Sequence, residues 1–451
     1  MNKLYLVLIS CFSLFLTVYL FAGNPSDAKK NWPQWRGPDA TGVAPNANPP
    51  LEWSEDKNIR WKIQVPGKGL ASPVIWGNMV FILSAVEEKK EGLKKEEHKP
   101  NPGERRRGFF RRKRAKPTSI VKFTIFALNR KDGSIIWQHT PREQIPHAGF
   151  HPDASWASNS AVTDGELVFA HFGSYGLFCY DMQGNLKWEK DLGDMTTRNG
   201  FGEGSSPAIY NDKLVVNWDH EGDSFIVVLD KNTGEEVWRA ERDERTSWAT
   251  PIVVEQNGKP QVIASATNRI RGYDLATGDV IWETAGMTAN TIPSPVHKNG
   301  VVYAMSGFRG NALLAIRLAA AKGDITDSDA IVWKFDRDTP YVPSPLLYGN
   351  ILYFLKHNKG ILTAFNITTG EHFYGPQRLD SIQGVYASPV GAKDRVYITG
   401  RNGVTLVIKH GPEFEVLAEN SLDDGFDASP AIAGNELYLR GRKNLYCIAE
   451  N

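Results

Sequence analysis

Hydrophobic and polar positions along this chain form short runs, and the same order of runs recurs as a module. Each copy begins with Ser-Pro and a turn, continues through two apolar runs, and ends with a Gly turn and a run that carries an aromatic residue. The clearest copy is residues 205–238, SSPAIYNDKLVVNWDHEGDSFIVVLDKNTGEEVW. Short apolar runs bounded by turn residues predict strands, so each copy predicts a four-stranded antiparallel sheet.

The module occurs eight times, and its proline marks each copy except the second, where Ala161 takes the same place. The prolines are Pro73, Pro207, Pro251, Pro295, Pro345, Pro389 and Pro430. From Pro207 onward they are 41 to 50 residues apart, a spacing typical of propeller blades.

The last copy stops after its third strand, and the run NIRWKIQV (58–65) supplies the missing outer strand, with Trp61 in the aromatic position. The sequence therefore predicts an all-β fold, an eight-bladed β-propeller of four-stranded antiparallel blades over residues 31–451. Its last blade is closed by the N-terminal strand, which leaves no open sheet edge at the seam.

Two repeated positions predict how the blades pack. The outer strand carries a large ring that we expect to cover the joint with the next blade. These rings are Trp137, Trp188, Trp238, Trp282, Trp333 and Tyr374. Cys179 and Cys447 occupy one repeated core position in copies that are not neighbours, so we expect buried free thiols rather than a disulfide.

The N-terminal part of the chain predicts export and a latch. Residues 1–23 carry a lysine and a long apolar run, typical of a cleaved signal peptide or a retained N-terminal anchor. The stretch LISC, which ends at Cys11, leaves lipidation as a third alternative. All three place the body in the periplasm or at the cell envelope. The stretch NWPQWRGPDATGV (31–43) precedes the closing strand, so its tryptophans are expected to pack beside the seam, with ligand binding as the alternative.

Charge is balanced over the chain, with 52 basic and 51 acidic residues, which argues against a general nucleic-acid binder. The exception is a charged insertion at residues 86–119 of the first blade, expected to be flexible because it has few core residues. Its second half carries a basic tract that includes Arg105, Arg106, Arg107, Arg111, Arg112, Lys113 and Arg114. They predict either a tolerated surface loop or contact with a polyanion, such as an anionic membrane or a polysaccharide. Nucleic acid is the least favoured partner, because the leader predicts export.

The turns of the form D-x-x-TG-x-x-x-W and the opening NWPQWRGP resemble the repeats of the quinoprotein (pyrroloquinoline quinone, PQQ) superfamily over nearly all of residues 31–451. The pattern is most similar to exported bacterial PQQ-like propellers of the BamB-like group, for which VTDGELVFAHFGSYGLFCYD and RTSWATP are typical. This resemblance implies the fold more strongly than it implies an activity.

Two functions stay open, and a binding or assembly scaffold without catalysis is favoured. An aromatic residue precedes the inner strand in six copies, and we expect these rings to gather at one mouth of the channel and to bind a protein or glycan. They are Trp156, Phe201, Trp248, Tyr341, Tyr386 and Phe426. On this interpretation the protein is a monomer or part of an envelope complex.

The alternative is a PQQ-dependent alcohol dehydrogenase. The resemblance implies a quinone stacked on a tryptophan and a Ca²⁺ ion held by Glu, Asn and Asp. The candidates here are Trp248, Glu203, Asn217 and Asp219. The adjacent Cys-Cys pair of that family is missing, and the four residues do not align with its calcium ligands. We expect His147 and His151 to be ordinary loop histidines, so no metal site is predicted from them.

Overall fold

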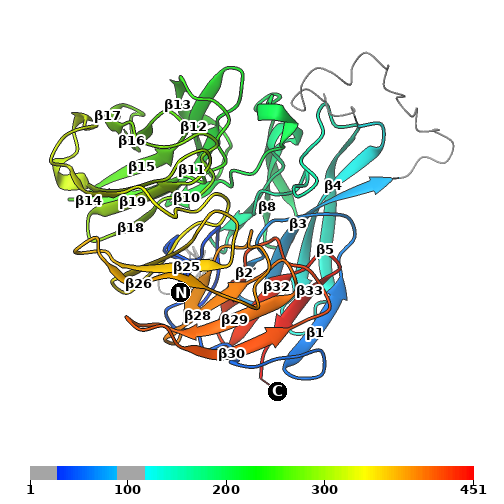
Figure 1. The fold of residues 1–451 in the computed structure, drawn as a ribbon. Coiled ribbons are helices and arrows are strands. Elements are labelled where there is room, and N and C mark those ends of the chain that lie inside the picture. The colour runs from blue at the N-terminus through cyan, green and yellow to red at the C-terminus, as the bar shows by residue number, and fades with distance from the viewer. Residues whose placement is uncertain (1–27, 89–116, 451) are drawn as a thin grey trace, which may run out of the picture.

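The structure, a computed structural model, describes residues 28–88 and 117–450. These residues form eight sheets arranged around one central axis (Figure 1), which confirms the predicted all-β, eight-bladed propeller.

The first four blades have these strands, from the inner to the outer. Blade 1 contains β2 (Val74–Trp76), β3 (Met79–Glu88), β4 (Ile120–Asn129) and β5 (Ile135–Gln144). Blade 2 contains β6 (Val162–Thr163), β7 (Leu167–His171), β8 (Leu177–Asp181) and β9 (Leu186–Lys190). Blade 3 contains β10 (Ala208–Tyr210), β11 (Lys213–Trp218), β12 (Ser224–Asp230) and β13 (Glu236–Arg242). Blade 4 contains β14 (Ile252–Gln256), β15 (Lys259–Ser265), β16 (Ile270–Asp274) and β17 (Val280–Thr284).

The other four blades follow the same order. Blade 5 contains β18 (Val296–Lys298), β19 (Val301–Ser306), β20 (Ala312–Arg317) and β22 (Ile331–Phe335). Blade 6 contains β23 (Leu346–Tyr348), β24 (Ile351–Leu355), β25 (Ile361–Asn366) and β26 (His372–Arg378). Blade 7 contains β27 (Val390–Ala392), β28 (Arg395–Thr399), β29 (Val404–Lys409) and β30 (Val416–Ser421). Blade 8 contains β31 (Ala431–Ala433), β32 (Glu436–Arg440), β33 (Asn444–Ile448) and β1 (Ile59–Gln64). Three short 3₁₀ helices, η2 (Gly173–Tyr175), η3 (Arg198–Gly200) and η4 (Leu318–Ala320), lie in connections.

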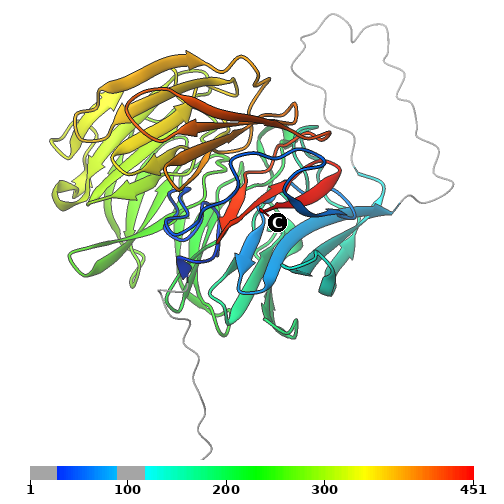
Figure 2. The ribbon, with the colours of Figure 1, turned by 90° about the horizontal axis from the view of Figure 1, so that it is seen from below.

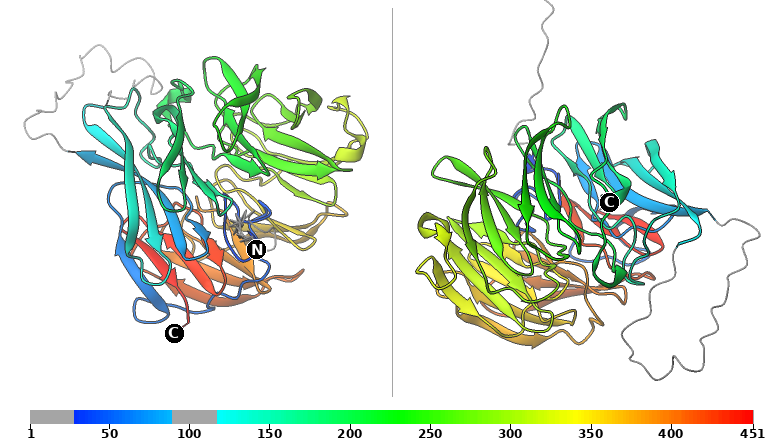
Figure 3. Two further views of the ribbon diagram at one scale, coloured as in Figure 1. Left: turned by 180° about the vertical axis from the view of Figure 1, so that it is seen from behind. Right: turned by 90° about the horizontal axis from the view of Figure 1, so that it is seen from above.

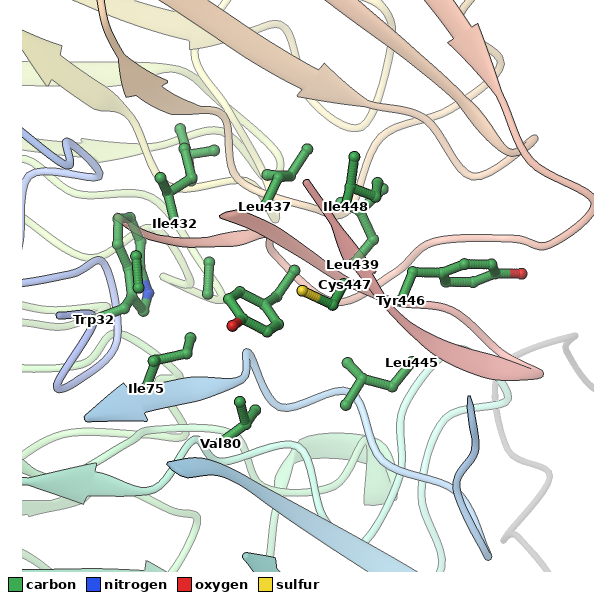
Figure 4. Close-up of a cluster of buried hydrophobic side chains, with 14 of the residues drawn as sticks. Trp32, Ile75, Val80, Ile432, Leu437, Leu439, Leu445, Tyr446, Cys447 and Ile448 are labelled. Atoms are coloured by element: carbon green, nitrogen blue, oxygen red, sulfur yellow. The ribbon is translucent and has the colours of Figure 1, made fainter. Parts of the chain in front are cut away.

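The ring is closed by the first strand, as the repeat predicts. β1 pairs antiparallel with β33, with Trp61 opposite Cys447 and Ile63 opposite Leu445. Figure 2 shows this N-terminal strand beside the C-terminal strands of the same sheet. The seam is packed by a buried cluster that includes Trp32, Ile75 and Leu445 (Figure 4). Closure therefore joins hydrogen bonds and hydrophobic packing from both ends of the described chain.

The outer-strand rings cover the joints between blades, as predicted. The indole N–H of Trp188 donates to the carbonyl of Lys231 in the turn of the next blade, at 2.9 Å. The glycine of that turn, Gly234, has φ +73°, and a Cβ on it would lie 2.8 Å from the Trp188 ring. Trp61, Trp137, Trp238 and Trp333 donate in the same way to carbonyls of the following blade. The glycine of the TG turn is thus required for two reasons. Its φ angle is positive, and the neighbouring tryptophan ring lies too close to leave room for a Cβ atom.

Blade 4 departs from the repeat. A fifth, two-residue strand, β21 (Gly323–Asp324), pairs parallel with its outer strand β17, because the long connection between β20 and β22 of blade 5 returns there. Trp282 is fully buried as a result, and its indole N–H bonds the Gln261 side chain of its own blade at 3.1 Å. The prediction of four strands per blade therefore holds for seven sheets in the described residues, and the eighth has one more.

The cysteines behave as the repeat predicts. Cys179 and Cys447 are both free and buried in different hydrophobic clusters. Burial raises the pKa of each thiol to about 12, which keeps both protonated and unreactive at neutral pH. No helix among the described residues is long and apolar enough to cross a membrane. Residues 1–23 lie outside the described chain.

The N-terminal segment 31–50, which we call the strap, crosses the end of the channel. Trp32 is 1 % exposed and exchanges two backbone hydrogen bonds with Ile75 of β2, in blade 1. Further along, backbone bonds join the strap to Leu347 and Gly391 on the inner strands of blades 6 and 7, and to Gly434 in the turn after the inner strand of blade 8. In the left view of Figure 3 this dark-blue segment lies over the middle of the ring. Trp32 thus packs at the seam, as expected, whereas Trp35 lies away from the seam and contacts Ser294 at the start of blade 5.

Candidate functional site

A ring of hydroxyl side chains surrounds the channel axis, and we call it the hydroxyl ring. Its members precede the repeated proline or its equivalent: Ser72, Ser160, Ser206, Thr250, Ser294, Ser344, Ser388 and Ser429. From Ser72 to Ser388, the backbone N–H of each member donates to the hydroxyl of the next, over 2.8 to 3.0 Å. The circle is completed where the hydroxyl of Ser72 donates to the carbonyl of Ser429 at 2.9 Å. The Ser-Pro of the module is therefore a link between neighbouring inner strands.

A cavity of about 260 Å³ lies on the axis and is lined by residues from every blade. Six members of the hydroxyl ring face it: Ser206, Thr250, Ser294, Ser344, Ser388 and Ser429. Trp35 of the strap also lines it, and its indole N–H donates to the Ser294 hydroxyl at 3.1 Å. The strap therefore supplies an aromatic floor, and the loops that enter the inner strands form the rim.

Four of the six predicted mouth aromatics line this cavity: Phe201, Trp248, Tyr341 and Tyr386. All four are partly exposed. The indole N–H of Trp248 is fixed by a 2.7 Å hydrogen bond to the carbonyl of Gly202. The ring of Tyr341 is stacked on Phe308 with the ring centres 4.7 Å apart. These contacts hold the rings in place, so the aromatic wall is preformed.

The other two predicted aromatics, Trp156 and Phe426, are not among the residues that line this cavity. Trp156 donates its indole N–H to the Ala148 carbonyl at 2.9 Å and packs edge-on against Phe150. Phe426 is 1 % exposed and packs in the seam core near Tyr446. The backbone of Phe426 also forms an antiparallel bridge with Gly441. The next residue, Asp427, lines the cavity in its place.

A charged network at the rim was not predicted from the sequence. The Arg401 guanidinium contacts Asp153 and Asp427, each at 2.6 Å, and lies over the ring of Tyr386, 4.1 Å from its centre. The Tyr386 hydroxyl donates to the second oxygen of Asp153 at 3.1 Å. Partial burial alone would raise the pKa of Asp153, but the bond from Arg401 lowers it below its usual range. Because these residues come from three different copies, no local motif indicates the network.

Glu203, in the loop that enters blade 3, also lines the cavity. Its two oxygens accept the backbone N–H and the hydroxyl of Ser174, at 2.8 and 2.6 Å. Burial raises the pKa of Glu203 to about 6, although the bonds from Ser174 act in the opposite direction. The side chain therefore changes charge close to neutral pH, next to Trp248.

The four residues named for PQQ and calcium do lie together, since Glu203, Asn217, Asp219 and Trp248 line one small cavity of about 10 Å³ beside the larger one. That volume is about enough for one water molecule. Asp219 is fully buried, and both its oxygens bind the Arg242 guanidinium, at 2.7 and 3.2 Å. Its charge is thus neutralised by an arginine where a calcium ion would require a free carboxylate.

The rest of this cluster agrees with that conclusion. The Asn217 amide donates to Asp219 at 3.1 Å, and its carbonyl oxygen is buried without a partner. Within residues 28–88 and 117–450, no group of three or more His, Cys, Asp or Glu could hold a metal ion. The residues present therefore do not fit a calcium–quinone centre. They form a buried Arg–Asp–Asn network beneath the mouth.

The remaining sequence predictions concern loops. His147 lies near Met195 and Asp194, and His151 lines the larger cavity near Asp153, so the two do not share a helix face. The charged insertion begins later than expected, because β3 continues to Glu88 and pairs there with Ile120 of β4. The basic residues from Arg105 to Arg114 lie outside the described residues, and their contact with a polyanion stays a prediction.

Comparison with known proteins adds a family and a fold. The family model described as outer membrane protein assembly factor BamB matches residues 51–221 and 222–451. A search of the curated proteins found no match. Among solved structures, BamB from Moraxella catarrhalis is 16 % identical, with a TM-score of 0.50 over 74 % of this chain and 92 % of that one.

Two dehydrogenases also share the fold. A europium-containing methanol dehydrogenase is 11 % identical, with a TM-score of 0.60 over 91 % of this chain and 90 % of that one. The quinohemoprotein alcohol dehydrogenase ADHIIG from Pseudomonas putida HK5 is 11 % identical, with a TM-score of 0.54 over 93 % of this chain and 77 % of that one. At these identities the likeness concerns the propeller alone.

Proposed function

The chain belongs to the family of the outer membrane protein assembly factor BamB, and from this premise we propose that it is a binding scaffold of the cell envelope. Its axial cavity holds part of a protein or glycan partner, and the protein has no catalytic role. We place the body in the periplasm or at the envelope, as the leader predicts. The protein acts as a monomer or as one part of an envelope complex.

The observation that carries this proposal is the composition of the cavity. Preformed aromatic side chains, hydroxyls and carboxylates converge on one half-open cavity to which every blade contributes. Ligand sites are usually lined by apolar and aromatic groups with a few well-placed polar ones. A cavity that served only packing would be filled by side chains, as the rest of the interior is.

The experiment compares retention of envelope material on immobilised protein. We expect the double variant Trp248→Ala, Tyr386→Ala to keep the melting temperature of the wild type within about 3 °C, because both rings are partly exposed at the rim. The double variant should nevertheless no longer retain the envelope proteins or glycans that the wild type retains. The matched control is Phe373→Ala, a ring 37 % exposed on the outer strand β26, far from the cavity lining. Equal retention by wild type and double variant contradicts the proposal.

The alternative, a Ca²⁺/PQQ-dependent alcohol dehydrogenase, is not favoured by the donor set around Asp219. It is tested by adding PQQ and Ca²⁺, scanning the absorbance of the desalted protein, and measuring reduction of a dye with primary alcohols. Quinone uptake together with alcohol-dependent dye reduction would replace the scaffold proposal by the enzyme.

The basic tract of the insertion is proposed to contact anionic membrane or polysaccharide. Deleting residues 105–116 should lower retention on a heparin column and leave the melting temperature unchanged, because such contacts depend on charge and weaken with salt. Retention that does not change with the deletion removes this part of the proposal.

A further inference from the structure

The floor of the cavity offers hydrogen-bond donors. Each of its six ring hydroxyls accepts a backbone N–H from the preceding copy. In the part of the chain that the structure describes, none of the six hydroxyls is the donor of a hydrogen bond. A hydroxyl carries one proton, so six O–H groups around the axis are available to a ligand that has acceptors.

The rim offers hydrogen-bond acceptors. Glu203, Asp153 and Asp427 line the cavity, and a carboxylate has about four acceptor sites. Glu203 uses two of them for Ser174. Asp153 uses its oxygens for Arg401 and Tyr386, and Asp427 is held by Arg401 and Arg442. The carboxylate of Glu203 can therefore accept further hydrogen bonds from the donors of a ligand.

The walls and the centre of the floor offer flat apolar faces. Trp248, Phe201 and Tyr341 stand at the rim, and Trp35 lies across the bottom. The two indole N–H groups are already bonded, to Gly202 and to Ser294, which leaves the ring faces to the ligand. A ligand that fits must therefore have an apolar face as well as polar edges.

We propose that the cavity binds a single neutral sugar ring, either a free saccharide or the end unit of a glycan. This inference rests on the proposed function in the same cavity and names its ligand class. A pyranose has hydroxyls that both accept and donate at its edge and carbon-bound hydrogens on its face. It can therefore use the O–H groups of the floor, the carboxylate of Glu203 and the face of Trp248 together.

Other ligand classes match only part of the lining. An anion would meet three carboxylates at the rim. A cation would find two of those carboxylates already paired with arginines, and a floor that presents hydroxyl protons. An extended peptide is too large, because about 260 Å³ lies below the usual range of about 300 to 1,000 Å³ for ligand pockets.

The test measures binding of defined probes by calorimetry and saturation-transfer NMR on the full chain. The sugar arm uses methyl glycosides of glucose, galactose, mannose and N-acetylglucosamine, and then their linear trimers. The cation arm uses lysine methyl ester, and the anion arm uses gluconate. Tighter binding of a trimer than of its monomer assigns the ligand to a glycan end, and equal binding assigns it to a free sugar.

We expect at least one methyl glycoside to bind, with weak affinity typical of a small ligand. Trp248→Ala should weaken it about tenfold or more, and Trp248→Phe should restore part of the loss because stacking remains. Glu203→Gln should weaken a neutral sugar less than tenfold, since an amide oxygen still accepts. Phe373→Ala should leave binding unchanged.

Binding of lysine methyl ester with no binding of any glycoside overturns the sugar assignment and points to a basic side chain of a protein partner. No glycoside binding at all also overturns it, as does binding that is insensitive to Trp248→Ala. These results are separable from the scaffold test. If envelope material is retained in a Trp248-dependent way but no sugar binds, only the ligand class is refuted. If retention does not depend on Trp248, the channel mouth is refuted as the binding site.

Discussion

The joints between blades and the channel mouth are built from the same module in opposite ways. At the joints one arrangement recurs, an outer-strand tryptophan bonded to the next turn and covered by its glycine. At the mouth the repeated hydroxyls are joined by residues that differ from copy to copy, and charged groups such as Asp427 and Glu203 occur once. Repeated side chains thus build the ring, whereas unrepeated ones around the axis are where we locate function.

The largest effect is expected where an unrepeated pair is buried beneath the mouth. Arg242→Met should lower the free energy of unfolding by about 3 to 5 kcal/mol, because the fully buried Asp219 would lose the arginine that neutralises it. The double variant Arg242→Met, Asp219→Leu should recover most of that loss. Denaturant unfolding measures both. If the double variant is as unstable as the single one, the Arg242–Asp219 pair is needed for the stability of the fold, as the tryptophan contacts between blades are.

Loss of one joint should come next. Trp188→Ala removes a ring that packs between blades 2 and 3 and its bond to Lys231, and should cost about 3 kcal/mol. The control is Leu186→Ala on the same strand, 51 % exposed, which should change the stability by less than about 0.5 kcal/mol. If both variants unfold at the same denaturant concentration, the repeated rings do not hold the blades together.

Glu203 should make the mouth sensitive to pH. Its pKa is raised from the ordinary 4.5 to about 6, so the folded state favours the protonated form. The stability of the wild type should therefore fall relative to Glu203→Gln as the pH rises from 4.5 to 6, by up to about 2 kcal/mol, and stay lower above pH 6. Unfolding curves from pH 4 to 8 measure the difference. If the stability of the wild type minus that of Glu203→Gln stays constant or rises with pH over this range, the raised pKa of Glu203 is contradicted.

The smallest effect is expected in the hydroxyl ring, which is repeated yet faces the cavity. Ser344→Ala leaves the backbone N–H of Ser294 without its acceptor and should cost about 1 kcal/mol. Ser344→Thr should be neutral within about 0.5 kcal/mol, since Thr250 occupies the same place in the fourth copy. Thermal unfolding measures both. A threonine variant as unstable as the alanine variant would show that shape, not the hydroxyl, is required there.

Much of the ring could be predicted from the sequence, because its elements are local and repeated. The turn glycines, the outer-strand tryptophans, the cysteine positions and the missing fourth strand of the last copy all follow from comparison of one copy with the next. The closing pair of Trp61 and Cys447 follows in the same way. The fifth strand of blade 4 could not be predicted, because it comes from an insertion in another copy.

The candidate site could be predicted only in part. Position in the module placed four aromatic residues at the mouth, but it could not tell that the ring of Phe426 turns into the core while Asp427 faces the cavity. The network of Asp153, Arg401 and Asp427 joins copies 248 and 26 residues apart in the chain, so no local pattern encodes it. Trp35 reaches the cavity only because the strap crosses the ring.

Pairing of β1 with β33 has a consequence for the order of folding. The partners Ile63 and Leu445 are about 380 residues apart, so the first strand to be synthesised must wait for the last one before it finds its place. Until then, blade 8 lacks an outer strand and β1 is available to another chain. The same contact that completes the native ring therefore makes a truncated or slowly produced polypeptide prone to exchange of β1 between molecules and to aggregation.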